Sequence, residues 1–331
     1  MFLVTSTGFE SELEVLFSLL GAGFVSFVVT HGMMMLNILD HPKERSSHVQ
    51  PIPTSGGVAI ICGFLTFITA YHFYVAPLIT PPVLWILGGG MFLGLMGFVD
   101  EVVEISFLKR LAVQLTVSAL VIINVFPYVD LLSLKFIVLL ILLGGFVNAY
   151  NFFDGLNGLA GTAALIVSLF AFLFFSTTSV LYLALVPGLL GFLYWNYKGK
   201  IIQGDVGTFF TGFCLPSFLL LEFQDISESV LVMGYLFFPV LFDISATVAL
   251  RLLQRKSVTT PHKGFFFHQL NLKGWPHLKV TSLYAGLLVL QGFTAFIFNM
   301  RDPFTLGMLY LGCALFYSTL FWFLLKYPAK P

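Results

Sequence analysis

Long apolar runs separated by short polar stretches dominate this chain of 331 residues. A transmembrane helix needs roughly 20 predominantly apolar residues, and the pattern predicts about eleven such spans. We therefore expect an all-α integral membrane protein, with one polytopic domain filling residues 1–331. The predicted spans lie at 15–36, 57–76, 83–100, 110–126, 134–150, 158–175, 180–196, 208–222, 230–250, 279–298 and 304–325.

The clearest polar interruption of this pattern is the stretch FVNAYNFFDGLNGLAG at 146–161. An unpaired amide or carboxylate surrounded by lipid costs several kcal/mol. The stretch should therefore face water, protein or a ligand, although an ordinary polar loop is a simpler alternative. Its polar side chains are those of Asn148, Asn151, Asp154 and Asn157.

The basic residues define the predicted orientation. Fourteen of the sixteen Lys and Arg residues fall in alternate connections, and only Lys135 and Arg301 fall on the other side. The positive-inside rule makes the larger set cytoplasmic. An odd number of spans then places the N-terminus in the periplasm and the C-terminus in the cytoplasm. Five polar loops share the cytoplasmic face, where we expect the functional site: 37–56, 100–109, 151–157, 198–207 and 251–276.

The composition agrees with a membrane protein. Hydrophobic residues make up 58% of the chain and charged residues only 10%, with a mean hydropathy of +0.95. Soluble domains are closer to half apolar and a quarter charged. The formal net charge is zero, and no nucleic-acid partner is expected. Cys62, Cys214 and Cys313 lie inside apolar runs and form neither a disulfide framework nor a metal-ligand spacing.

Two adjacent acids, Asp100 and Glu101, end the third predicted span. They lie at the negative end of a helix dipole, where an acid is unfavourable by roughly 0.3–1 kcal/mol, and they repel one another. A divalent cation or the basic pair Lys109 and Arg110 could compensate them. A solvated helix end is the simpler alternative.

Two further acids are candidates for chemistry. Asp205 lies between Gly204 and Gly207 where a new apolar helix begins. Its carboxylate suits Mg²⁺, which usually takes one or two protein ligands plus phosphate oxygens; a helix N-cap is the alternative. Asp243 lies inside the ninth predicted span and is a functional candidate for that reason. We expect Arg251 to be its partner, in a pair that could equally be structural.

The first and last cytoplasmic loops carry cationic groups that could bind phosphate. In the first loop, the general excess of cytoplasmic charge is a sufficient alternative. The last loop adds an aromatic trio at 265–267, which fits a nucleotide diphosphate or an interfacial lid, although a surface amphipathic segment is also compatible. The cationic candidates are Lys43, Arg45 and His48 in the first loop and His262, Lys263 and His268 in the last.

Acids for Mg²⁺ and cations for phosphate on one face point to phosphoryl-type transfer, where positioning and charge neutralisation do most of the catalysis. No P-loop, GxGxxG or nucleophilic Ser or Cys motif occurs. A site at the inner surface can take one substrate from water and one from membrane lipid. The alternatives are an inactive scaffold and a transporter, but transporters tend to show repeated halves and midplane polar groups, and no repeat is visible.

Motifs along nearly the whole chain resemble, in order and spacing, the polyprenyl-phosphate N-acetylhexosamine-1-phosphate transferases, bacterial glycosyltransferase family 4. The resemblance implies transfer of a sugar-1-phosphate from a UDP-N-acetylhexosamine to undecaprenyl phosphate, with Mg²⁺ or Mn²⁺ as cofactor and UMP as product. It implies a bacterial inner-membrane enzyme; family members are often dimeric, so a homodimer is open. The matching stretches include DHPKERSSH, GFVDE, NAYNFFDGLNGLAG, YWNYKGKIIQGDVGTFFTG and PHKGFFFHQ.

The resemblance also implies residue roles. Asp205 matches the metal-binding Asp of the family, and Asp100 matches the first acid of an aspartate pair that acts on the lipid phosphate or helps to hold Mg²⁺. Glu101, one methylene longer than the usual Asp, takes the second, catalytic position. The residues expected to bind substrate are Lys43, Arg45, His48, Lys109, Arg110, Asn148, Asn151, Asp154, Asn157, Asn196, Gly204, His262, Lys263 and His268.

The last loop bears on the branch of the family. PHKGFFFHQ lacks the triple histidine of the phospho-N-acetylmuramoyl-pentapeptide transferases and departs from the His-x-His-His pattern of the N-acetylglucosamine-type enzymes. It is closer to the O-antigen-initiating branch, with Phe265 in place of the usual second histidine. We therefore expect an enzyme that starts an O-antigen or similar envelope glycan. The muramoyl-pentapeptide transferase of peptidoglycan synthesis is the alternative.

Overall fold

The computed structural model describes residues 9–42, 50–103, 105–175, 177–222, 226–257, 262–298 and 302–326. Almost all regular structure in these residues is helical, as predicted. The elements are α1 (Phe9–Met35), β1 (Leu39–Asp40), β2 (Ile52–Pro53), α2 (Gly57–Ala70), the π-helical turn η1 (Tyr71–Val75), α3 (Pro81–Val103), α4 (Phe107–Val125), α5 (Leu134–Phe153), α6 (Leu159–Phe174), α7 (Ser179–Asn196), α8 (Gly204–Glu222), α9 (Ile226–Leu236), α10 (Phe238–Leu253), α11 (Phe266–Leu272), α12 (His277–Ile297) and α13 (Pro303–Lys326).

Among the described residues, nine helices are long and apolar enough to cross a bilayer. The chain is therefore a multi-pass membrane protein. The predicted span at 230–250 is wrong as a single helix, because α9 ends at Leu236 and α10 begins at Phe238. Pro239 lies in the first turn of α10. Within a continuous helix this proline would lack a backbone donor and clash with the carbonyl four residues earlier, so the chain breaks before it.

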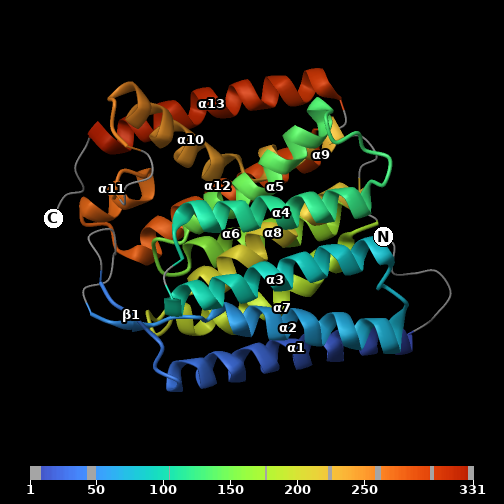
Figure 1. Cartoon of the computed structure of the whole chain (residues 1–331). Helices are drawn as coiled ribbons and strands as arrows, with labels where there is room; N and C mark the ends of the chain where they lie inside the picture. The colour runs from blue at the N-terminus through green and yellow to red at the C-terminus, as the bar shows by residue number, and fades with distance from the viewer. Residues whose placement is uncertain are drawn as a thin grey trace.

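The helices lie side by side in one bundle, with β1 and α11 at the same end (Figure 1). The C-terminus of α3 and the N-termini of α4 and α8 lie at this end too. We call it the polar end. The most enclosed span is α8, in which 83% of an 18-residue stretch is buried, compared with 11% in α13. Because α8 begins at the polar end, its first turn lies at the centre of that end.

The polar end is closed by backbone hydrogen bonds between loops that are distant in sequence. β1 and β2 pair antiparallel, with Leu39 opposite Pro53. The Ile202 N–H then donates to the Pro53 carbonyl over 2.9 Å, and the Gly56 N–H donates to the Ile202 carbonyl over 3.0 Å. The first polar loop is thereby attached to the segment that enters α8.

Glycines allow the helices around α8 to approach at backbone distance. A Cβ built on Gly97 of α3 would lie only 2.4 Å from the carbonyl carbon of Asp205, and one built on Gly57 of α2 only 2.1 Å from the Cα of Gly207. Small residues at helix contacts permit this kind of close approach in membrane proteins. The contact at Gly97 therefore determines how close α3 lies to the first turn of α8.

We predict that Gly97→Ala destabilises the protein by roughly 1–3 kcal/mol, because the added methyl group would overlap the α8 backbone, which cannot move aside cheaply. The thermal unfolding midpoint of the purified protein in detergent should fall.

Gly88→Ala on the same helix is the matched control, since a Cβ there meets no atom within 4 Å. Its midpoint should stay unchanged or rise slightly, because alanine favours a helix over glycine. Equal midpoints for the two variants would show that the α3–α8 contact is not close.

Candidate active site

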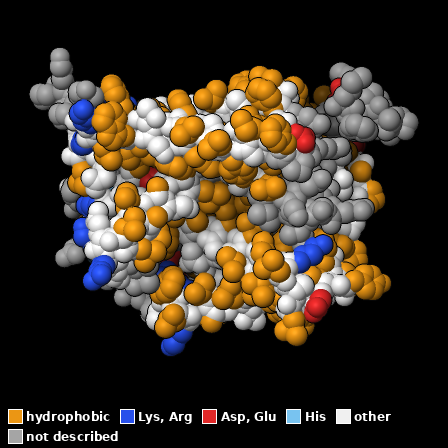
Figure 2. All heavy atoms as spheres, turned by 90° about the horizontal axis from the view of Figure 1, so that it is seen from above, with side chains coloured by type: hydrophobic (Ala, Val, Ile, Leu, Met, Phe, Trp, Pro, Cys, Tyr) orange, Lys and Arg blue, Asp and Glu red, His pale blue; other side chains and the backbone are white. Residues whose placement is uncertain are grey.

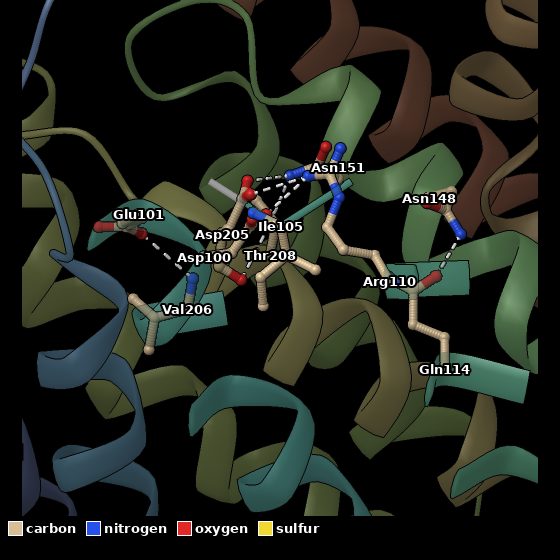
Figure 3. A network of polar contacts seen from close by, with 10 residues as sticks. All are labelled: Asp100, Glu101, Ile105, Arg110, Gln114, Asn148, Asn151, Asp205, Val206 and Thr208. Atoms are coloured by element: carbon tan, nitrogen blue, oxygen red, sulfur yellow. Dashed lines mark hydrogen bonds and ion pairs between the residues drawn. The ribbon is translucent and has the colours of Figure 1, made fainter. Parts of the chain in front are cut away.

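Two carboxylates and one guanidinium form the centre of the polar end. Arg110 Nη1, from α4, lies 2.8 Å from Asp100 Oδ2 of α3 and 3.1 Å from Asp205 Oδ2 of α8 (Figure 3). Asp100 also accepts a hydrogen bond from the backbone N–H of Ile105. The two acids thus converge on a single cation. The structure compensates Asp100 through Arg110, one of the two means expected from the sequence.

Asn151, on the last turn of α5, provides a second hydrogen-bond donor to Asp205. Its Nδ2 donates to Asp205 Oδ1 over 2.6 Å and to Thr208 Oγ1 over 2.9 Å. Asp205 itself lies inside the first turn of α8, which begins at Gly204 rather than at the predicted residue 208. A carboxylate in a first turn is favoured by the helix dipole, and the donors of Arg110 and Asn151 compensate Asp205 beside Asp100.

Asn148 lies one helical turn away from Asn151 on α5. Its Nδ2 donates to Gln114 Oε1 over 2.6 Å and to the Gly144 carbonyl over 2.9 Å, which fixes the orientation of the amide. Sequence reasoning missed Gln114 and Thr208. Their spacing was a usable signal, because Gln114 follows Arg110 by four residues and Thr208 follows Asp205 by three, which places each pair on one helix face.

Glu101 points away from the Asp100–Arg110–Asp205 group (Figure 3). Ser55 Oγ donates to Glu101 Oε2, and the Val206 N–H donates to Oε1 over 3.3 Å. Gly204, at φ +70°, leaves room for this carboxylate, since a Cβ there would lie 2.1 Å from Glu101 Oε1. Glu101 therefore binds the N-terminus of α8. The extra methylene, which distinguishes it from an Asp, gives it the reach to do so.

Asp154 follows the last residue of α5 and is partly buried. Burial, together with the negative charges of Asp205 and Glu101, raises the pKa of Asp154 to about 7. The predicted loop residue is thus electrostatically coupled to the carboxylate centre. Near neutral pH it can exist with or without its proton.

Two of the predicted asparagines hold loops together. The Asn196 side chain is buried; its Oδ1 accepts from the Gly158 N–H over 2.5 Å, and its Nδ2 donates to the Ile201 carbonyl over 2.7 Å. The Asn157 N–H donates to His277 Nδ1, and its carbonyl accepts from Thr281 Oγ1, both on α12. These contacts give Asn196 and the Asn157 backbone a positioning role in the described structure.

The last loop approaches the same region through α11, a short helix that the sequence reading did not expect. His268 lies against the loop after α5, because a Cβ on Gly155 would be 2.7 Å from His268 Nε2. His262 instead accepts from the Gly264 N–H. Burial and the positive charge of Arg251 lower the pKa of His262, which opposes the cationic role expected for it.

The remaining candidates are not brought to the centre by any described contact. Lys109 is exposed, and the Lys263 backbone carbonyl accepts from Gln269 on α11. Lys43, Arg45 and His48 lie outside the described residues.

The donor set at the centre fits a hard divalent cation in part. Asp100 and Asp205 already direct carboxylate oxygens at one positive charge, and such oxygens are typical ligands of Mg²⁺. Within the described ranges, no three His, Cys, Asp or Glu side chains gather into a metal-holding group. A metal ion at this position would therefore need water or phosphate oxygens for its remaining ligands.

Comparison with known proteins places the segment that carries the site in a sequence family. Residues 83–222, which contain Asp100, Arg110, Asn151 and Asp205, match the sequence model of glycosyl transferase family 4. Over these residues the chain is a glycosyl transferase family 4 sequence. This confirms the family resemblance found in the motifs.

Curated relatives extend the similarity over most of the chain. A probable undecaprenyl-phosphate N-acetylglucosaminyl 1-phosphate transferase of Bacillus subtilis is 27% identical over 280 residues, covering 78% of this chain and 77% of the relative. A decaprenyl-phosphate N-acetylglucosaminephosphotransferase of Mycobacterium leprae is 27% identical, covering 84% and 81%. A phospho-N-acetylmuramoyl-pentapeptide-transferase of Fervidobacterium nodosum is also 27% identical but covers 63% of this chain and 74% of its own length.

We predict that Glu101→Asp destabilises the protein more than Glu101→Gln. The shorter Asp carboxylate cannot reach the first turn of α8, whereas the Gln carbonyl can still accept a hydrogen bond there. Losing hydrogen bonds to a charged group costs roughly 1.5–3 kcal/mol. Thermal unfolding midpoints of the two variants measure the difference.

The transferase activities of Glu101→Asp and Glu101→Gln provide a second test. Ser55→Ala, which removes one donor to the same carboxylate, is the control. If Glu101 acted instead as a reacting carboxylate, Glu101→Asp would retain more activity than Glu101→Gln and both midpoints would match that of the wild type.

Proposed function

We propose that this protein transfers an N-acetylhexosamine-1-phosphate from a UDP-N-acetylhexosamine to undecaprenyl phosphate, releasing UMP. The observation that carries the proposal is the convergence of Asp100, Asp205 and Arg110 at the polar end of a membrane bundle. A diphosphate and a phosphate must approach each other in this reaction. Arg110 can attract their oxygens, and the two carboxylates can attract a metal cation that neutralises their charge. The names of the relatives, which use polyprenyl phosphates as acceptors, support the same reaction.

The reaction joins two anions. An oxygen of the lipid phosphate forms a bond to the β-phosphorus of the nucleotide sugar, while the bond from that phosphorus to the bridging oxygen breaks. UMP leaves with the bridging oxygen, and the product is a lipid-linked sugar diphosphate. Because little covalent chemistry falls to the protein, catalysis depends on positioning and charge neutralisation.

The residues at the centre can provide both positioning and charge neutralisation. The Arg110 guanidinium can bind phosphate oxygens, and the Asn151 amide fixes the orientation of Asp205. We expect Asp205 and Asp100 to hold Mg²⁺, for which Mn²⁺ could substitute. When bound, the metal ion would neutralise charge on the transferred phosphoryl group.

We further propose that the polar end faces the cytoplasm in a bacterial inner membrane. In Figure 2 hydrophobic side chains cover much of the flank, and most visible Lys and Arg side chains lie at its left end, where Figure 1 shows β1 and α11. This asymmetry agrees with the positive-inside rule. UDP-sugars in the cytoplasm and undecaprenyl phosphate in the bilayer would then meet at this surface.

The names of the relatives favour N-acetylglucosamine as the first sugar to test. The last loop still favours the start of an O-antigen or similar envelope glycan. Muramoyl-pentapeptide transfer is the second candidate, because relatives with that name also match. The absence of a histidine triplet in PHKGFFFHQ opposes it.

We predict that the purified protein in detergent releases UMP only when undecaprenyl phosphate, a divalent metal ion and one UDP-N-acetylhexosamine are all present. The measurement is UMP release across a panel of UDP-N-acetylhexosamines together with the muramoyl-pentapeptide nucleotide. The active donor would identify the substrate.

Asp205→Asn is the control for this assay. The amide has the same shape but cannot supply the negative charge, so turnover should fall by at least about a hundredfold, as for loss of one charge-stabilising group. UMP release by the wild type without lipid, or full turnover by a correctly inserted Asp205→Asn variant, would contradict the proposal.

The raised pKa of Asp154 generates a pH prediction. Below about pH 7 Asp154 carries a proton, which reduces the negative charge that attracts a cation to Asp205. The affinity for Mg²⁺ should therefore fall as the pH is lowered from 8 to 6, by less than the roughly tenfold per pH unit expected for a direct metal ligand.

Calorimetric titration of Mg²⁺ at several pH values measures this dependence, and Asp154→Asn is the matched variant. Its Mg²⁺ affinity should be weaker at pH 8 and less dependent on pH than that of the wild type. An equally steep dependence in Asp154→Asn would assign the titration to another group.

A further inference from the structure

A buried carboxylate outside the Asp100–Arg110–Asp205 centre has an unusual set of partners. Asp243, on α10, is only 1% exposed. The Phe266 N–H donates to its Oδ1 over 2.6 Å, and the Phe267 N–H and the Tyr284 hydroxyl donate to its Oδ2 over 3.3 and 2.5 Å. Thr247 makes a longer bond of 3.4 Å. The expected partner was wrong, because Arg251 instead donates to the Ser257 carbonyl.

These partners make Asp243 the cap of a helix to which it does not belong. Phe266 and Phe267 are the first residues of α11, and Phe265, which precedes them, provides no side-chain cap. A carboxylate that accepts from N–H groups at a helix N-terminus is stabilised by charge-assisted hydrogen bonds. Asp243 thus connects α10, α11 and α12 at one point.

Such an arrangement is costly, because a buried carboxylate must replace its hydration. Among the described residues, Asp243 forms no ion pair with Lys or Arg, and hydrogen bonds alone compensate it. A local Ser or Thr cap would stabilise α11 without burying a charge. The position of α11 relative to its neighbours is therefore the property that Asp243 specifically controls.

The position of α11 matters because this helix packs against the loop after α5. The ring of Phe267 packs edge-on against Phe153, with centroids 5.5 Å apart, and the Phe153 ring also contacts Tyr284 at 5.2 Å. A Cβ on Gly155 would lie 2.6 Å from the Phe267 ring and 2.7 Å from His268. The Asp243 contacts therefore continue, through α11 and Tyr284, to the segment that follows Asn151.

We propose that Asp243 is a positioning residue that holds α11 against the loop after α5 (154–157) in the geometry required to bind the nucleotide sugar. It need not touch substrate. Its loss should weaken donor binding more than it slows the chemical step, because the Asp100–Arg110–Asp205 group lies on other helices. The kinetic part of this inference rests on the proposed function, whereas the structural part does not.

Asp243→Asn tests the inference with little change of shape. The new NH₂ group cannot accept from the Phe267 N–H, and the altered charge weakens the remaining bonds. Amide hydrogen exchange of full-length protein in detergent should become about tenfold faster across 262–272, the change expected for losing about 1.4 kcal/mol of local stability. Exchange in α3 and α8 should remain unchanged.

Steady-state UMP release provides the second measurement. The KM for the UDP-sugar should rise about tenfold in Asp243→Asn, while kcat changes less than about threefold. Tyr284→Phe removes one donor and should shift both measurements in the same direction by a smaller amount. Thr247→Val is the matched control: it alters a weak bond to the same carboxylate, not one to α11, and should resemble the wild type.

The outcomes separate this inference from the proposed function. Unchanged exchange in α11, uniformly faster exchange throughout the bundle, or a fall in kcat with an unchanged KM would each overturn the positioning role. If the wild type releases no UMP with any donor, the proposed function fails. Faster exchange confined to α11 in Asp243→Asn would still establish the structural connection.

Discussion

The close contact between α3 and α8 is the constraint on which the candidate site depends. Gly97 lies against the backbone of Asp205, so the two helices approach more closely than side chains would allow. Asp100 follows Gly97 by three residues and therefore points toward the same first turn. Arg110 can bind both acids with one nitrogen only because this helix contact has already placed them together.

The same proximity brings together more negative charge than the basic residues of the site compensate. Four acids gather at one end of the bundle: Asp100, Glu101, Asp154 and Asp205. Among the described residues, Arg110 forms the ion pairs with this group, to Asp100 and Asp205. Burial, together with this unbalanced charge, raises the pKa of Asp154. A region with excess negative charge and fixed carboxylates is prepared to bind a cation, and that cation in turn allows phosphates to approach.

The sequence predicted most of the fold because span length is a local property that the bilayer imposes. It also predicted Arg110 as compensation for Asp100, since charge can be read without geometry. It did not predict that Glu101 turns toward Val206, because that contact requires α3 to lie against α8. It gave Asp243 the wrong partner for a related reason. Arg251 is close in sequence, but the donors come from α11, a helix that forms only when the last loop folds back onto the bundle.

Glu101, Asp205 and Asp243 show how one chemical group serves different purposes at this surface. Each carboxylate lies near the N-terminus of a helix, where N–H groups and the helix dipole stabilise negative charge. Glu101 and Asp243 use both oxygens to bind protein donors, and each holds a helix that begins at the polar end. Asp205 lies inside its own helix, and its partners are the side chains of Arg110 and Asn151. Side-chain partners can rearrange when a ligand binds more readily than backbone donors can, so Asp205 is the acid best suited to exchange protein contacts for a cation.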